Sequence, residues 1–376
     1  MPSSTSSFER SIPGGNWPAY FVATLLLTLM LLGGWEFFWR QAGYTPTLND
    51  TSDLWAATRT ELKKSPPGRT VLIGSSRMLF DFDLDVYAQY FETKKPLQLA
   101  VVGSTPIIIL EHLAEDETFV GTVLCGIVPG LYFVPQGPPV EWAKNAVRRY
   151  EQWAPSQRSG NWLGVQLEKR LAFIQQEDLT LNKLLESIDI PNRANAQVPP
   201  QLPPYFGKMW ENRQTRMWEN ATFETPRAQK IQQIWLPLFT PPPPPPGIAP
   251  EKFKEMFMAS VENYLQRTRE AVDKIRNRGG QVIFIRFPSS GELRELEAKF
   301  SPRPVFWEQL LVRADAPGIH FEDYPELADF RCPEWSHLSA GDATRFTQNL
   351  MPILEKKLDE LRQKQPVALQ SDMKKN

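Results

Sequence analysis

The chain has 376 residues, of which 41% are hydrophobic and 11% aromatic. This is enough apolar surface for a large core, which excludes wholesale disorder. A net charge of -1 excludes the broadly basic surface that a nucleic-acid partner would need. Two cysteines, Cys125 and Cys332, are too few for a disulfide framework, and no cluster of His and Cys has the spacing of metal ligands. We therefore expect no metal and no other cofactor.

The first predicted element is a membrane anchor over residues 17–39, which follows a short N-terminal tail (1–16). Residues 17–35 carry no charge, and roughly 20 apolar residues cross a bilayer as a helix. A cleaved signal peptide is disfavoured because its apolar region is usually roughly 7–15 residues long. Arg10 is the only basic residue before the span and several follow it. The positive-inside rule weakens when a long domain follows, so the charges leave the orientation open.

Residues 66–135 alternate short apolar runs with amphipathic stretches. The runs lie at 71–73, 97–104 and 121–129, and each ends in Gly, Ser or Pro. Continuously apolar strands that alternate with helices predict a parallel sheet covered on both faces, and hence an α/β fold.

The composition changes over residues 136–249, which are rich in tryptophan and proline. We interpret this segment, with its helical stretch at 140–186, as a helical insertion or lid, which a fold tolerates because the cost of loop closure grows slowly with length. The proline run at 241–246 cannot lie within a helix or a central strand. A linker or loop is favoured over a ligand for a proline-binding module.

The α/β pattern returns over residues 250–363. A helix is predicted at 251–278, a buried strand at 281–288, a short strand within 318–327 and a closing helix from 340 to about 362. The last residues, 364–376, are expected to be disordered. The predicted α/β domain is therefore split into 66–135 and 250–363.

The stretch "VLIGSSRMLF" (71–80) places two hydroxyls where the first strand ends, at the edge where ligands bind to parallel sheets. A polar turn is the simplest explanation. A serine here becomes a nucleophile only with a base in reach, usually an imidazole oriented by a carboxylate. "CPEWSH" (332–337) supplies Glu334 and His337 at close spacing, although a helix cap or a solvated pair also fits. His320 is expected to be packed in the core, and His112 to be exposed.

Two arginines lie beside this edge. Arg77 follows the two serines, and Arg286 ends the strand at 281–288. Each guanidinium is a candidate to bind an anionic or carbonyl group of a substrate. A structural salt bridge with one of the many acidic residues is the alternative.

Together these residues resemble the SGNH (GDSL-like) hydrolases. "IGSSRM" is similar to the first family block, with Ser76 in the nucleophile's place and Ser75 where the family usually has Asp. "EWSHLS" is similar to the last block, with His337 as the general base and Glu334 in place of Asp. Gly103 matches the second-block glycine, whose amide would form an oxyanion hole with that of Ser76. The third-block Asn is missing from "CGIVPGLYF", and Ser104 and Thr105 are the nearest polar substitutes.

The resemblance implies a flavodoxin-like three-layer α/β/α sandwich. The chain is more similar still to the membrane-anchored branch of this superfamily, which includes proteins of D-alanyl transfer and of alginate-type O-acetyl transfer. The first hypothesis is an anchored esterase or O-acyltransferase that acts outside the cytoplasm on an envelope or exported polysaccharide. The second is a catalytically inactive scaffold that binds a glycan or a membrane-bound acyltransferase. The missing Asn and the Glu at 334 motivate the second hypothesis.

Overall fold

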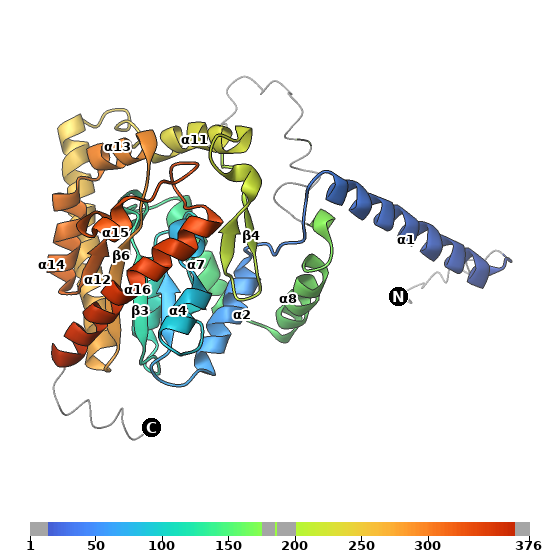
Figure 1. Cartoon of the computed structure of the whole chain (residues 1–376), viewed down its shortest axis with the longest axis horizontal. Coiled ribbons are helices and arrows are strands. Elements are labelled where there is room, and N and C mark those ends of the chain that lie inside the picture. The colour runs from blue at the N-terminus through green and yellow to red at the C-terminus, as the bar shows by residue number, and fades with distance from the viewer. Residues whose placement is uncertain (1–13, 175–184, 186–200, 365–376) are drawn as a thin grey trace, which may run out of the picture.

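The computed structural model describes residues 14–174, 185 and 201–364. Its first element is α1 (Trp17–Gln41), which projects from the rest of the molecule (Figure 1) and has no buried residue. Among the described residues this helix alone is long and apolar enough to cross a membrane, by length and composition. The predicted tails (1–16 and 364–376) lie almost entirely outside the described residues, as does the end of the helical stretch predicted at 140–186.

The centre of the molecule is a parallel sheet with strand order β2-β1-β3-β6-β7. Val71 pairs with both Leu97 and Val123, and Ile285 pairs with Ile319. The predicted parallel sheet is thus confirmed, but β2 is much shorter than the predicted run 97–104. The strands are β1 (Thr70–Ile73), β2 (Leu97–Gln98), β3 (Thr122–Gly126), β6 (Gln281–Arg286) and β7 (Gly318–His320).

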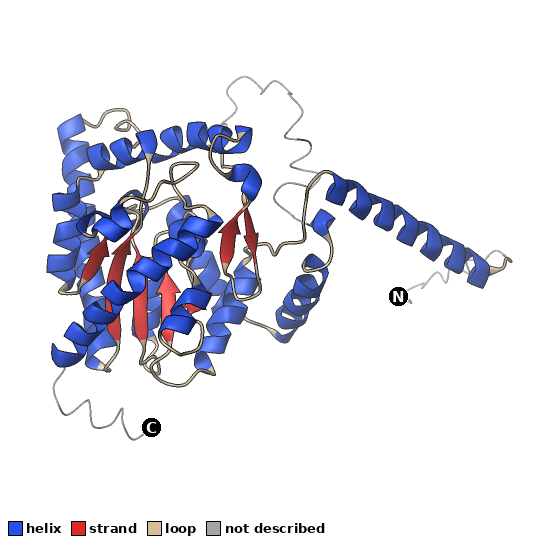
Figure 2. Cartoon of the chain, viewed as in Figure 1, coloured by secondary structure: helices blue, strands red, loops and turns tan. Residues whose placement is uncertain are grey.

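Apolar side chains cover both faces of the sheet, which is why the strands have no polar alternation. On one face Leu72 joins a cluster completed by α16 (Ala340–Lys364). On the other face Val71 joins a cluster with α5 (Ile107–Glu115) and α12 (Pro250–Asn277). Figure 2 shows the strands flanked by these helices. The remaining described helices outside the segment 136–249 are α2 (Ser52–Lys63), α3 (Ser76–Phe80), α4 (Leu84–Tyr90), α6 (Pro129–Tyr132), α13 (Gly291–Phe300), η3 (Pro304–Glu308), α14 (Gln309–Ala314), η4 (Phe321–Asp323) and α15 (Pro325–Ala328).

The segment between the two halves packs against the sheet layers instead of forming a separate body. Its first helix contacts α2 and α5. Arg213, in the turn of its hairpin, donates to the backbone oxygens of Gln98 and Ala100 at the end of β2 and pairs with Asp50. The elements of this segment are α7 (Pro138–Glu151), α8 (Pro155–Glu168), η1 (Ala172–Ile174), β4 (Gly207–Met209), β5 (Thr215–Met217), η2 (Glu219–Ala221) and α11 (Pro226–Phe239).

Helix α11 lies across the end of the sheet to which the strands point (Figures 1 and 2). The proline run then connects α11 to α12 as a loop, in agreement with the linker interpretation. Because proline lacks an amide hydrogen and fixes φ, the run separates two helices that would otherwise be nearly continuous in sequence.

The histidine on β7, His320, is packed in the core, as predicted. His320 is buried, stacks on Phe321 and accepts a hydrogen bond from the backbone amide of Glu322 through Nδ1. An acceptor nitrogen is a neutral one. Burial, assisted by Arg286, lowers the pKa of His320 to about 3. The predicted exposure of His112 is wrong: it is half-buried against Tyr150, and burial lowers its pKa to about 4.

This shift predicts that His320 makes the fold sensitive to acid. Between its unfolded pKa of about 6.5 and its folded pKa of about 3, the unfolded chain binds the extra proton, so stability falls as the pH falls through that window. In His320→Asn the amide oxygen can replace the Nδ1 acceptor. We expect the slope of unfolding free energy against pH to be smaller in this variant by up to about 1.4 kcal/mol per pH unit. Urea unfolding at several pH values measures it, and equal slopes would contradict the prediction.

Candidate active site

Ser76 is the first residue of α3 and follows β1 through a sharp turn at Gly74. Gly74 has φ +156°, and a Cβ there would lie 2.8 Å from that of Met78 and 3.2 Å from the backbone oxygen of Gly126. Only glycine fits this close approach without a shift of the backbone. The turn buries Ser75 and leaves Ser76 partly exposed, so of the two hydroxyls it is that of Ser76 which can meet a ligand. The Ser75 hydroxyl is buried and has no hydrogen-bond partner within the described part of the chain.

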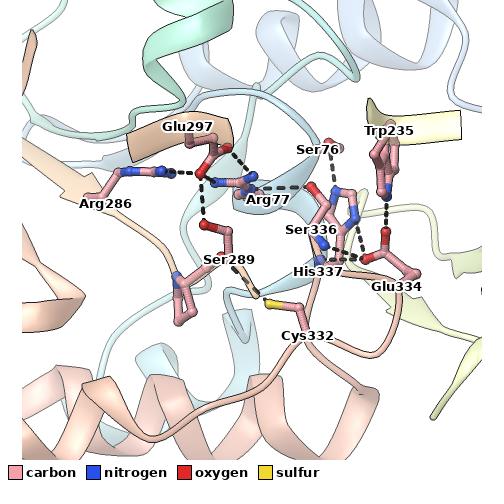
Figure 3. A network of polar contacts seen from close by, with 11 residues as sticks. Ser76, Arg77, Trp235, Arg286, Ser289, Glu297, Cys332, Glu334, Ser336 and His337 are labelled. Atoms are coloured by element: carbon pink, nitrogen blue, oxygen red, sulfur yellow. Dashed lines mark hydrogen bonds and ion pairs between the residues drawn. The ribbon is translucent and has the colours of Figure 1, made fainter. Parts of the chain in front are cut away.

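The structure brings Ser76, His337 and Glu334 into one hydrogen-bonded chain (Figure 3). The hydroxyl oxygen of Ser76 lies 2.7 Å from Nε2 of His337, and Nδ1 of His337 lies 2.9 Å from Oε1 of Glu334. Because an ionised carboxylate only accepts, Nδ1 carries the proton and Nε2 is the nitrogen that can accept from the serine. The predicted grouping of these three side chains is therefore present across a separation of 261 residues.

Three further donors hold the Glu334 carboxylate in place. The backbone amides of Ser336 and His337 donate to Oε1, and the indole nitrogen of Trp235 donates to Oε2 (Figure 3). Glu334 is completely buried. A glutamate is one methylene longer than the family's aspartate, and these donors fix where the longer side chain ends. Its geometry is thereby suited to orient the imidazole.

Aromatic rings surround the His337 imidazole, which is completely buried. Ring centroids lie at 4.8 Å for Phe80, 5.3 Å for Phe206 and 5.9 Å for Trp235. Phe206 and Trp235 come from the segment 136–249, which the sequence analysis treats as an insertion or lid. These rings keep water from the sides of the imidazole and leave Ser76 and Glu334 as its polar neighbours. We did not predict either aromatic residue, because tryptophan and phenylalanine are common throughout this segment.

The candidate oxyanion hole is formed at the ends of β1 and β2. The amide of Val101 donates to the Gly74 oxygen at 3.1 Å, which brings the turn containing Gly103 to the turn containing Ser76. Among the described residues, neither the Ser76 nor the Gly103 amide donates a backbone hydrogen bond beyond its own helix or strand. Gly103 has φ +64°, and a Cβ there would lie 2.7 Å from the ring of Trp142 in α7. The site thus requires glycine at this position.

The two polar side chains named as substitutes for the missing Asn have other partners. The Ser104 hydroxyl donates to the Val101 oxygen at 3.0 Å, and the Thr105 hydroxyl donates to the Tyr132 oxygen at 2.9 Å. Both residues are buried. After β3 the chain enters α6 with no side-chain amide, so the backbone amides are the donors that this site offers to an oxyanion.

Arg77 and Arg286 share one carboxylate, that of Glu297 in α13 (Figure 3). All three side chains are buried. Arg77 also reaches Ser336 at 3.3 Å, and the Ser289 hydroxyl donates to Glu297 at 2.7 Å. The structural salt bridge, the alternative to a substrate clamp, is what the geometry favours. Arg77 thereby ties the turn at Ser76 to the loop that carries Glu334 and His337.

One buried acid, Asp81, and two buried thiols, Cys332 and Cys125, have pKa values that burial raises. Burial raises the pKa of Asp81 well above its usual range, and one of its oxygens accepts from the Leu338 amide at 2.8 Å. Burial likewise raises the pKa of Cys332 and of Cys125, both of which are free thiols. Within the residues that the structure describes, no group of three His, Cys, Asp or Glu side chains is arranged to hold a metal ion.

A groove of about 840 Å³ lies beside the loop that carries Glu334, between α11, α15 and α16. Phe223, Phe330 and Trp335 contribute aromatic rings to it, and Arg331 and Arg345 contribute charge. Ser76 does not line this groove. The groove therefore borders the outer side of the loop that carries Glu334, not the Ser76 hydroxyl.

Comparison with known proteins leaves the site to be interpreted on its geometry. No protein-family model matches the chain, and no curated protein matches it.

Proposed function

We propose that the protein is a serine esterase or O-acyltransferase of the SGNH type. The observation that carries this proposal is the chain of hydrogen bonds from the Ser76 hydroxyl through His337 to Glu334, at 2.7 Å and 2.9 Å. Hydrogen-bond reach between nucleophile and base, with the base oriented by a third group, is the arrangement that makes a serine nucleophilic. The strand order β2-β1-β3-β6-β7, read as 2-1-3-4-5, is that of a flavodoxin-like sheet and supports the SGNH assignment.

The proposed reaction proceeds in two steps. The Ser76 oxygen attacks the ester carbonyl while its proton passes to Nε2 of His337, and Glu334 stabilises the resulting imidazolium. The amides of Ser76 and Gly103 bind the oxyanion of the tetrahedral intermediate. Its collapse leaves the acyl group on Ser76 and expels the alcohol, which takes the proton from His337. A water or a sugar hydroxyl then attacks the acyl-enzyme by the same steps in reverse.

The place of action follows from α1 and from the family resemblance. The apolar helix α1, the one candidate span within the described residues, supports a single-pass membrane protein with the membrane lipid bilayer as a permanent partner. By resemblance, the catalytic domain lies outside the cytoplasm and the acceptor or donor is an envelope or exported polysaccharide, with a membrane-bound acyltransferase as partner. Protease digestion of intact cells and spheroplasts distinguishes the two sides of the membrane.

The second candidate function is a catalytically inactive scaffold that binds a glycan or the membrane-bound acyltransferase. It is favoured by one observation: the Ser104 and Thr105 hydroxyls donate to backbone oxygens, so neither is free to take the place of the third-block Asn.

A fluorophosphonate probe tests the catalytic proposal. It reacts with an activated serine, and the adduct is located by mass spectrometry of proteolytic peptides of the full-length protein in detergent. We expect one adduct, on Ser76, together with turnover of aryl acetates. An adduct on Ser75 would move the nucleophile by one residue. Absence of both labelling and turnover would support the scaffold.

Trp235→Phe tests whether the indole hydrogen bond to Glu334 contributes to catalysis. Phenylalanine keeps an aromatic ring beside His337 but removes the donor to Oε2. We expect kcat to fall by roughly 10-fold, the effect of losing a charge-assisted hydrogen bond worth about 1.5 kcal/mol, with KM nearly unchanged. Trp210→Phe, at an exposed tryptophan in the turn between β4 and β5, is the matched control. A change in KM alone would contradict this role.

A further inference from the structure

Helix α8 exposes an apolar, almost uncharged face. Trp162 is 65% exposed, Leu163 53% and Leu167 41%, whereas the core contact of the helix is made by Val165. Gly164 and Gln166, which lie between these residues, are uncharged and half-buried, and Arg158 and Glu168 are the charged residues of the helix. Leaving two leucines and a tryptophan exposed to water loses several kcal/mol of the stabilising free energy that burial would give, at about 25 cal/mol per Å² of apolar surface. Contiguous exposed apolar groups of this kind mark a binding surface.

The residues that follow α8 are hydrogen-bonded to the C-terminal end of α1. Arg40 of α1 donates to the backbone oxygen of Arg170 at 2.8 Å, immediately after α8. Glu36 accepts hydrogen bonds from the amides of Ala172 and Phe173 at 3.0 and 3.2 Å. Glu168, at the end of α8, accepts from the Asn49 amide at 3.0 Å. Helix α8 therefore has a fixed place relative to the end of the apolar helix.

Figure 1 shows that α8 runs crosswise to α1, on the side of the domain from which α1 projects. A membrane-spanning helix stands across the bilayer, so a helix crosswise to its end lies along the bilayer surface. Exposed tryptophan and leucine are the side chains that enter the boundary between headgroups and acyl chains. The position, direction and composition of α8 therefore all favour the lipid bilayer surface as the binding partner of its exposed face.

We propose that the Trp162, Leu163 and Leu167 face of α8 docks into the lipid bilayer surface and forms a second membrane contact beside α1. The proposal rests on the anchoring of α1 and is independent of the acyl chemistry. It gives the domain two attachments, so that the domain cannot swing freely about the end of α1. Because α8 follows α7, whose Trp142 packs on Gly103, the docked helix also fixes the height of the Ser76 site above the membrane.

Depth-dependent quenching in nanodiscs tests this contact in the full-length protein. Single cysteines are introduced as Leu163→Cys and, for comparison, as Val312→Cys. Val312 is 70% exposed and belongs to α14, a helix on the opposite side of the molecule from α1 (Figure 1). The native Cys125 and Cys332 are buried and stay unlabelled in the folded protein. Each cysteine carries an environment-sensitive fluorophore, and the discs contain lipids with a nitroxide on the acyl chain.

We expect the fluorophore at 163 to lose roughly half of its emission, because an interfacial helix buries its apolar face about 5–10 Å deep, whereas that at 312 is unchanged. A label introduced as Met30→Cys in α1 reports the anchor itself. If the label at position 30 is quenched and the label at 163 behaves like that at 312, the docking of α8 is wrong, whereas the membrane anchor is supported. If 30 is not quenched either, the anchor and the docking are both wrong. Protection of 163 from aqueous quenchers in native membranes, without quenching in lipid discs, would assign the face to a protein partner and also overturn the proposal.

Discussion

Ser76→Ala is expected to reduce kcat/KM for aryl acetates by at least about 10³–10⁴-fold, because loss of the nucleophile removes the covalent step and leaves only binding and the oxyanion hole. Labelling by the fluorophosphonate probe should disappear in the same variant. The hydroxyl of Ser76 contacts only His337 among the described hydrogen bonds, so its removal costs the fold little. Equal thermal unfolding of variant and wild type shows that the loss is chemical.

Ser75→Ala is the matched control, one residue away on the same turn. The Ser75 hydroxyl is buried without a partner, so replacing it removes no hydrogen bond. We expect activity and labelling to be retained and stability to stay equal or rise slightly. Retention of activity in Ser76→Ala with loss in Ser75→Ala would contradict the assignment of the nucleophile. Retention in both variants would contradict serine catalysis by this turn.

The candidate catalytic residues can be predicted from the sequence because the rules that place each of them are local. A strand that ends in Gly-Ser-Ser puts a hydroxyl at the carboxyl edge of a parallel sheet, and Glu-x-x-His before a helix directs both side chains the same way. Parallel pairing of β1 and β2 then brings Gly103 to Ser76. Each of these steps is local to its own segment, and the order of the motifs together with the family resemblance is what predicts that Ser76 and His337 meet across 261 residues.

The residues that support the reacting groups depend on long-range packing, which has no local signal. Trp235 and Phe206 reach His337 only because α11 and the strand β4 fold back over the end of the sheet. Tryptophans in this segment were treated alike in the sequence, whereas Trp162 proves exposed and Trp235 buried. Helix α13, which carries Glu297, was not predicted, and without it the two arginines had no identified partner.

Glu297→Gln is expected to destabilise the fold by about 3–5 kcal/mol, because it leaves two buried guanidinium groups without a counter-charge. Glutamine keeps the size of the side chain and can still accept from Ser289. The matched control is Glu295→Gln, an exposed residue on the same helix, which should change stability by less than about 0.5 kcal/mol. Urea unfolding of the full-length proteins in detergent at pH 7 measures both values, and equal midpoints would contradict the prediction.

The pH dependence of the stability difference between wild type and Glu297→Gln distinguishes the loss of a charge from a disturbance of packing. Burial alone would raise the pKa of Glu297, but Arg286 and Arg77 lower it to about 2. A depressed pKa contributes stability above the unfolded value of about 4.5, and that contribution is lost as the pH falls towards 2. The gap between wild type and Glu297→Gln should therefore narrow over this window. A gap that stays constant would mean that the glutamine disturbs packing, and that the shared ion pair is not what holds Arg77 against the loop of Glu334 and His337.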